Sequence, residues 1–151
     1  MRRHALAITL VSCLFPVAAW AAPVPAPCSL VDHDTLAALT LGDAVTKVEL
    51  KTVPATAQAP AQQIAMCTFT RRVGAAPSLS VMVTPLPPRT APAKPVCNDS
   101  AVKGIGMASC FGVVKDAMVS VSLVAPLATF AGLNATLRTR FGRIVEGAAA
   151  P

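Results

Sequence analysis

Apolar and polar residues alternate along several short segments in the middle of the chain. The clearest alternation runs through residues 64–72, 79–84, 111–114 and 119–123. A period of two is typical of strands that bury one face and expose the other. We therefore predict two hairpins, one turning at residues 74–77 and the other at Lys115 and Asp116. A less regular alternation in residues 45–50 predicts a further strand or edge segment.

The apolar spacing near the C-terminus is helical instead. After Pro126, apolar residues recur every three or four positions: Phe130, Leu133, Leu137, Phe141 and Ile144. This spacing predicts an amphipathic helix. A second, shorter helix is predicted after Asp32, whose carboxylate is suited to cap the first amides, with Gly42 placed to end the helix in a left-handed conformation.

The order of these elements predicts an α+β domain, a small antiparallel sheet with two helices on one face, stapled by two disulfides. We place this single domain at residues 28–146 and expect 147–151 to be a disordered tail. Residues 85–95 hold five prolines in eleven positions. Because proline lacks an amide donor, this segment predicts a long loop or crossover and excludes a helix or central strand.

The N-terminus predicts export. Arg2 and Arg3 precede an uncharged, apolar run that ends in the small residues Ala19 and Ala21. This is the pattern of a secretory signal peptide over residues 1–21, cleaved after Ala21. The alternating alanines and prolines of residues 22–27 then predict a stiff, extended linker.

Cys13 leaves a second interpretation open. Leu10-Val11-Ser12-Cys13 matches a lipobox, in which the cysteine is acylated and anchors the protein to a membrane. The residues after Cys13 stay apolar, which favours cleavage after Ala21. A third alternative is an uncleaved anchor, since the apolar run is close to the roughly 20 residues that span a bilayer.

The cysteines agree with an oxidising compartment. Four remain in the mature chain: Cys28, Cys67, Cys97 and Cys110. An even number predicts two disulfides, for which three connectivities exist. We favour Cys28 with Cys67 and Cys97 with Cys110, because each pair then lies in its own half of the chain. The alternative, a zinc or redox site, lacks any C-x-x-C pair and has His33 far from every cysteine.

The charge of the mature chain is mildly basic. Removing Arg2 and Arg3 from the 13 Lys and Arg leaves 11 against 7 Asp and Glu, a net charge of +4. Most of these charges are scattered, which together with export argues against nucleic acid as a partner. The arginines that cluster are candidates for contact with an anionic envelope polymer, with a solvated face as the competing interpretation. They are Arg71, Arg72, Arg138, Arg140 and Arg143.

The sequence offers weak candidates for chemistry. Gly104-Ile105-Gly106 resembles part of a phosphate loop but lacks the third glycine and the Lys-Ser/Thr that follow it. His33 lies between two aspartates, which helix capping explains equally well. The methionines show no copper-binding spacing, which favours packing. A mature chain with one histidine offers no nucleophile and base pair, so we expect no catalytic residue, no cofactor and no metal.

Four segments carry a resemblance to a known family. They are Cys28-Ser29-Leu30-Val31, Leu39-Thr40-Leu41-Gly42, Cys67-Thr68-Phe69 and Val102-Lys103-Gly104-Ile105-Gly106-Met107-Ala108. Together they resemble a family of small exported bacterial domains of unknown function, best known from actinobacterial cell-envelope lipoproteins. The resemblance implies an α+β fold with a bridge between Cys28 and Cys67, and it implies no activity.

These observations predict a class of role. We expect a periplasmic or secreted bacterial envelope protein that is not an enzyme and that binds an unidentified envelope protein or ligand through the open sheet face or the proline-rich loop. One alternative is an accessory lipoprotein, with membrane contact only through an acylated Cys13. Another is a small inhibitor of an extracellular hydrolase.

Overall fold

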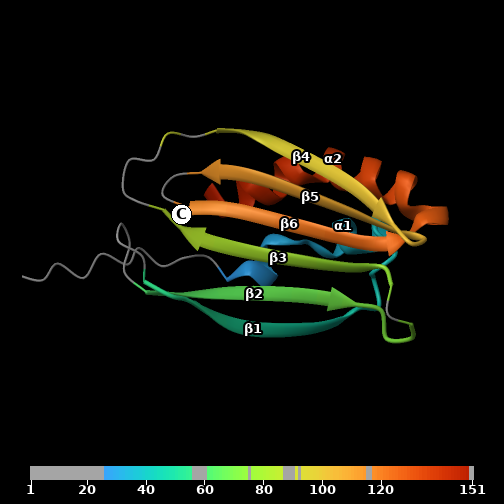
Figure 1. The fold of residues 1–151 in the computed structure, drawn as a ribbon, viewed down its shortest axis with the longest axis horizontal. Coiled ribbons are helices and arrows are strands. Elements are labelled where there is room, and N and C mark those ends of the chain that lie inside the picture. The colour runs from blue at the N-terminus through green and yellow to red at the C-terminus, as the bar shows by residue number, and fades with distance from the viewer. Residues whose placement is uncertain are drawn as a thin grey trace, which may run out of the picture.

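A computed structural model describes residues 26–55, 61–74, 76–86, 91, 93–114 and 117–149. The predicted signal peptide, Cys13, residues 22–25 of the linker, the turn at Lys115 and Asp116, and residues 150–151 lie outside the described residues. Figure 1 views the fold with the sheet in front and the helices behind it. The helices therefore cover one face of the sheet and leave the other uncovered.

The described residues form six strands in one antiparallel sheet. They are β1 (Val45–Val53), β2 (Gln62–Thr70), β3 (Ser78–Pro85), β4 (Ala93–Val102), β5 (Ile105–Val114) and β6 (Ala117–Pro126). The spatial order is β1-β2-β3-β6-β5-β4. Two predicted hairpins, β2 with β3 and β5 with β6, are confirmed, and the edge segment near residue 45 is the nine-residue strand β1.

The proline-rich loop is shorter than predicted. Strand β3 continues to Pro85, and β4 begins at Ala93 and includes Pro95. Strand β4 is tolerant of proline because it forms an edge of the sheet, where an amide facing away from β5 needs no strand partner. A hairpin that was not predicted then joins β4 to β5, with Lys103 and Gly104 at its turn, both with positive φ angles.

The expected long and short helices are both present, and a 3-10 turn that was not predicted precedes them, so the expected pair is roughly right. They are η1 (Pro27–Leu30), a 3-10 turn, α1 (His33–Ala38), and α2 (Leu127–Ala149). Helix α2 packs across β5 and β6, and η1 packs on β2 and β3. The helix continues past Glu146, where we expected the domain to end, because Ala148 still faces the core and is buried.

The caps of α1 follow the prediction at one end only. Asp32 caps the N-terminus, with its carboxylate accepting a hydrogen bond of 2.6 Å from the Thr35 amide. At the other end Thr40, not Gly42, takes the left-handed conformation, with φ at 59°. The Leu41 amide donates to the carbonyl of Leu36, and the Thr40 amide to that of Ala37, which is the Schellman pattern. This turn delivers Leu41 into the core, where it is fully buried.

The core lies between the sheet and α2. The helical stripe predicted from the sequence is buried along its whole length, and it belongs to one hydrophobic cluster with the inward side chains of the four central strands. Those side chains include Phe69, Leu79, Val81, Val121 and Leu123. Burial of each such side chain is worth roughly 1.5–3 kcal/mol, so this layer is the main source of stability.

Both favoured disulfides are present. Cys28 in η1 is bonded to Cys67 in β2, with Cα atoms 5.2 Å apart. Cys97 and Cys110 are bonded across directly opposite positions of β4 and β5, with Cα atoms 4.0 Å apart. Disulfides of this kind are typical of proteins that fold in an oxidising, extracellular type of environment.

Candidate functional site

The uncovered face of the sheet carries a row of small polar side chains. Five of them occupy directly opposite positions in neighbouring strands: Thr68, Ser80, Ser122, Ser109 and Asn98. The Thr68 and Ser80 hydroxyls are 3.2 Å apart, as are those of Ser109 and Ser122. These hydroxyls therefore satisfy one another across the strands and leave a smooth, hydrogen-bonding stripe on the surface.

This outer face is uncharged over most of its width. In the described part of β2, β3, β5 and β6, and in β4 from Val96 onward, the outward positions hold no Asp, Glu, Lys or Arg. Charges on this face are found on β1, at Lys47, Glu49 and Lys51. A surface without charge is unusual because Lys, Glu, Asp and Arg are the residue types most often exposed.

Large apolar side chains gather at one side of the outer face. The β4–β5 patch comprises Val96, Val102, Ile105, Met107 and Phe111, each between 38% and 55% exposed. Val96 lies directly opposite Phe111, and Val102 opposite Ile105, so the patch consists of cross-strand pairs. The polar pair Asn98 and Ser109 lies between the two groups of apolar side chains. Exposed apolar side chains gathered on an uncharged face with no helix over it are the kind of feature that marks an interaction site.

The sequence pattern did not indicate this patch. The alternation predicts no strand between Pro95 and Phe111, so Val96, Val102, Ile105 and Met107 have no expected face. The available signal was the pair Val102 and Ile105 on either side of Lys103-Gly104. Gly at a two-residue turn between apolar residues is typical of a hairpin.

The methionines belong to the same face. Met66 and Met82 are directly opposite each other on β2 and β3, and Met118 lies on β6 opposite Thr84. All three are half-buried. Thioether side chains adapt their shape to different neighbours, which suits a contact surface. Among the described residues, no group of three or more His, Cys, Asp and Glu side chains is placed to hold a metal ion.

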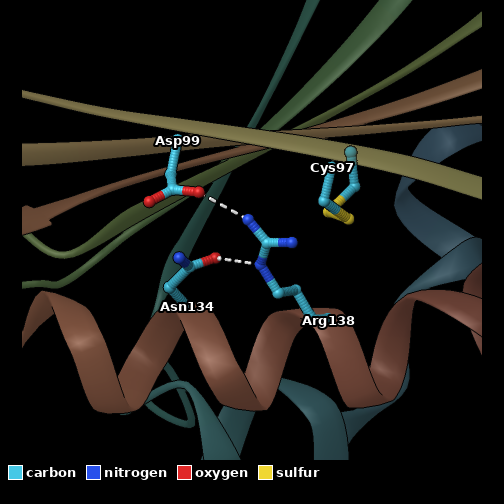
Figure 2. Close-up of polar contacts among 5 residues, drawn as sticks. Cys97, Asp99, Asn134 and Arg138 are labelled. Atoms are coloured by element: carbon cyan, nitrogen blue, oxygen red, sulfur yellow. Dashed lines mark hydrogen bonds and ion pairs between the residues drawn. A yellow bond between two sulfur atoms is a disulfide. The ribbon is translucent and has the colours of Figure 1, made fainter.

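The clustered arginines do not share one surface. Arg71 lines a shallow hollow with Thr129 and Leu133, near the start of α2. Arg138, farther along that helix, donates to Asp99 of β4 at 2.5 Å and to Asn134 at 3.2 Å. Figure 2 shows this contact beside the disulfide of Cys97, where it ties the edge strand to α2.

The two remaining arginines of α2 act on the cap of α1. Hydrogen bonds from Thr35 lower the pKa of Asp32, and the positive charges of Arg140 and Arg143 lower it further. The aspartate beside His33 therefore has a capping role, and His33 itself is the exposed first residue of α1.

Both glycines of Gly104-Ile105-Gly106 have structural roles. Gly104 adopts φ of 81° in the turn between β4 and β5, and its carbonyl accepts a 2.9 Å hydrogen bond from the Leu127 amide at the start of α2. Gly106 lies in β5 directly beneath the Phe130 ring. The segment therefore links the β4–β5 turn to the start of α2.

The helix side of the sheet contains a second, smaller surface. A shallow groove of about 330 Å³ lies beside η1 on the part of β1 and β2 that the helices leave uncovered. Its walls are mostly apolar and include Cys28, Val48, Leu50, Ala65 and Val83. Val48 and Leu50 are consequently exposed despite facing the helix side.

No protein-family model matches the chain, and no curated protein or solved structure shows significant similarity to it. In the described part of the chain, no helix is both long enough and apolar enough to span a membrane. The surfaces above are therefore the basis for assigning a role.

Proposed function

We propose that this protein is an exported, non-catalytic binding module whose outer sheet face docks a protein partner. The observation that carries the proposal is the β4–β5 patch, which lies on a face without charged side chains from β2 to β4. Aromatic residues and methionine are enriched in the core of protein interfaces, where charged residues are depleted. The outer face has this composition while it is exposed to solvent.

The shape of the face favours a protein over a small molecule. Small ligands bind in concave sites that enclose most of their surface. The hollows beside η1 and beside the start of α2 lie away from the outward positions of β4 and β5. A broad surface of this kind is suited to a partner of comparable breadth.

The chemistry of the face also describes the partner. Met107 and Phe111 offer apolar contact, and the row of hydroxyls beside them offers hydrogen bonds. The outward strand positions around the patch hold no charged side chain, and Lys103 in the β4–β5 turn is a single positive charge at one end, too little by itself to select an anionic polymer or an anionic lipid headgroup. We infer a partner surface that is apolar at its centre and polar but uncharged around it.

The compartment follows from the sequence and is consistent with the disulfides. A cleaved signal peptide places the protein in the periplasm or outside the cell, and acylation at Cys13 would place it on a membrane instead. Intact mass of the protein purified from its native host distinguishes these outcomes. A mature chain starting at Ala22 supports release, and an acylated N-terminal Cys13 establishes the lipoprotein.

The binding proposal is tested with a substitution in the patch and a matched control. Phe111→Asp places a charge on the one aromatic side chain of the patch, and Val73→Asp makes the same type of change at a highly exposed position between β2 and β3. The mature protein and both variants are immobilised and exposed to an envelope extract of the native host, and bound proteins are quantified by mass spectrometry.

We expect at least one protein to be retained by the wild type and by Val73→Asp but lost, by about tenfold or more, with Phe111→Asp, since a buried unpaired charge costs several kcal/mol. Circular dichroism of each variant verifies its fold. If Phe111→Asp retains the same proteins in the same amounts, or if the wild type retains none above an empty matrix, the outer face is not the docking surface.

A further inference from the structure

Strand β1 is an edge of the sheet that the described residues form. Among the described residues it is paired with β2 alone, so the amides and carbonyls along its other side face outward over nine residues. The opposite edge differs, because β4 contains Pro95 and a register shift between Ala93 and Val96. Proline and irregular pairing are common protections of an edge strand, and β1 has neither.

The charges of β1 are arranged to complement a second copy of the same strand. Lys47, Glu49 and Lys51 point to the outer face in the order positive, negative, positive, and Lys47 contacts Glu49 at 2.6 Å. In an antiparallel pair centred on Glu49, glutamate would oppose glutamate and lysine would oppose lysine. A pair centred on Leu50 instead places each Glu49 opposite Lys51 of the second copy, so like charges do not meet.

The other face of β1 supports the same register. Val48 is 59% exposed and Leu50 is 70% exposed, although both point to the helix side of the sheet. They are exposed because η1 and α2 do not reach over β1. Centring the pair on Leu50 brings the two Leu50 side chains together beside the two apolar grooves and removes this surface from water.

We propose that a second copy of the chain pairs antiparallel with the first along β1, with Leu50 on the two-fold axis, and joins the two sheets into one continuous sheet. The interface is isologous, as in most closed dimers. It uses the β1 edge and leaves the β4–β5 patch free, so dimer formation and partner binding are independent outcomes.

The charge pattern provides the first test. Sedimentation velocity of the mature protein, from micromolar to near-millimolar concentration, is expected to show a concentration-dependent dimer. Glu49→Lys makes all three charges positive and opposes like charges both in the register centred on Leu50 and in the one centred on residue 49, so the dissociation constant should rise about tenfold or more. Adding Lys51→Glu to that variant restores opposite charges across the axis and should restore the dimer.

A control with the same change in net charge shows whether the effect arises from charges on β1 or from the total charge of the protein. Glu146→Lys lies at an exposed position near the end of α2, far along the chain from β1, and should leave the dimer intact. A wild type that stays monomeric throughout the concentration range overturns the proposal. So does a Glu49→Lys variant that associates as strongly as the wild type.

Cysteine cross-linking tests the register. Leu50→Cys places two thiols opposite each other across the axis, in the geometry that Cys97 and Cys110 already show between β4 and β5. In the same register, two cysteines from Val48→Cys are offset by about 13 Å along the strands, too far to bond. Oxidised Leu50→Cys should migrate as a covalent dimer and Val48→Cys as a monomer on a non-reducing gel. The reverse result, or no cross-link with either variant, overturns this register.

Discussion

Replacing Gly106 with alanine tests how closely α2 packs on the sheet. Gly106 is buried in β5, and an ideal Cβ atom there would lie 2.1 Å from Cγ of Phe130 and 2.5 Å or less from the two adjacent ring carbons. Carbon atoms in ordinary contact are about 3.5–4.0 Å apart. The ring would therefore have to move by more than about 1 Å, against a side chain that is itself buried in the core.

The size of the effect follows from this overlap. Overpacking a well-filled core costs roughly 1–3 kcal/mol, and three ring atoms in conflict with one methyl group place Gly106→Ala towards the upper end. Replacing a glycine within a strand raises the free energy of unfolding by about 0.5–1 kcal/mol, because the chain then loses less conformational entropy on folding. We expect the free energy of unfolding to fall by about 2 kcal/mol.

Chemical denaturation of a chain that begins at Ala22 measures this change. Far-UV circular dichroism is the appropriate signal, because the chain after Ala21 contains no Trp or Tyr. Gly132→Ala is the matched control, since a Cβ atom at that position of α2 meets nothing within 4 Å. It should stabilise the protein by about 0.5–1 kcal/mol through helix propensity.

A second variant tests whether the Phe130 ring causes the loss of stability. In a Phe130→Leu background the added methyl group meets a smaller side chain, so Gly106→Ala should cost at least about 1 kcal/mol less than in the wild type. If Gly106→Ala unfolds within about 0.5 kcal/mol of the wild type, or costs the same in both backgrounds, the described packing of α2 on β5 is wrong.

Three further predictions concern the links around the core. Replacing Cys97 and Cys110 together with serine removes the closure of a 13-residue separation and should lower the free energy of unfolding by about 3 kcal/mol in denaturant titrations. Asp32→Ala should cost about 1 kcal/mol at pH 7. Hydrogen bonds from Thr35 lower the pKa of the Asp32 carboxyl in the folded state. The contribution of Asp32 to stability is therefore fully present above the pKa of the unfolded state and is lost as the pH falls through the pKa of the folded state. The free energies of unfolding of the wild type and Asp32→Ala should consequently converge in acid. Arg138→Gln breaks an exposed ion pair with β4 and should cost about 0.2–1 kcal/mol at low salt, a difference that shrinks in 1 M NaCl.

The elements that the sequence predicted correctly each bury one face. In β3, the buried residues Leu79, Val81 and Val83 alternate with half-buried ones, and α2 buries a stripe at helical spacing. A residue pattern predicts an element only where one face is apolar and the other is polar, and these elements have such faces.

Strand β4 was not predicted because it lacks the contrast. Nearly all of its residues are exposed, since one edge and one face are open to solvent, and Cys97 is its one half-buried position. Pro95 suppresses the strand signal further. The signals that remain are the Lys103-Gly104 turn and the predicted disulfide between Cys97 and Cys110, and neither appears as an alternation of faces within β4.

The end of α1 shows tertiary structure overriding local preference. Gly42 is the residue best suited to a left-handed turn, but a turn there would lengthen the helix and carry Leu41 away from the core. Thr40 accepts the less favourable conformation because Leu39 and Leu41 are then both fully buried. Their burial outweighs the roughly 1–2 kcal/mol of backbone strain.

The candidate surface could be predicted only in part. The sequence indicated a sheet with one solvated face. The row through Ser80 and Ser122 depends on the register between β3 and β6, which are separated by a whole hairpin in the chain. Alternation assigns residues to faces but does not order the strands, so a pattern confined to each strand could not reveal the uncharged face or the β4–β5 patch.

The strand order also divides the molecule into two separately cross-linked pieces. Neither disulfide crosses the boundary between β3 and β6. Cys28 and Cys67 lie on one side of it, and Cys97 and Cys110 lie on the other. The polypeptide between Leu86 and Ala93 is then the one covalent connection between the halves. Two chains expressed separately on either side of that connection would each close their own disulfide, and would reunite through the hydrogen bonds of β3 with β6 and the shared core. The fold thus provides a natural site for splitting the protein into complementing fragments.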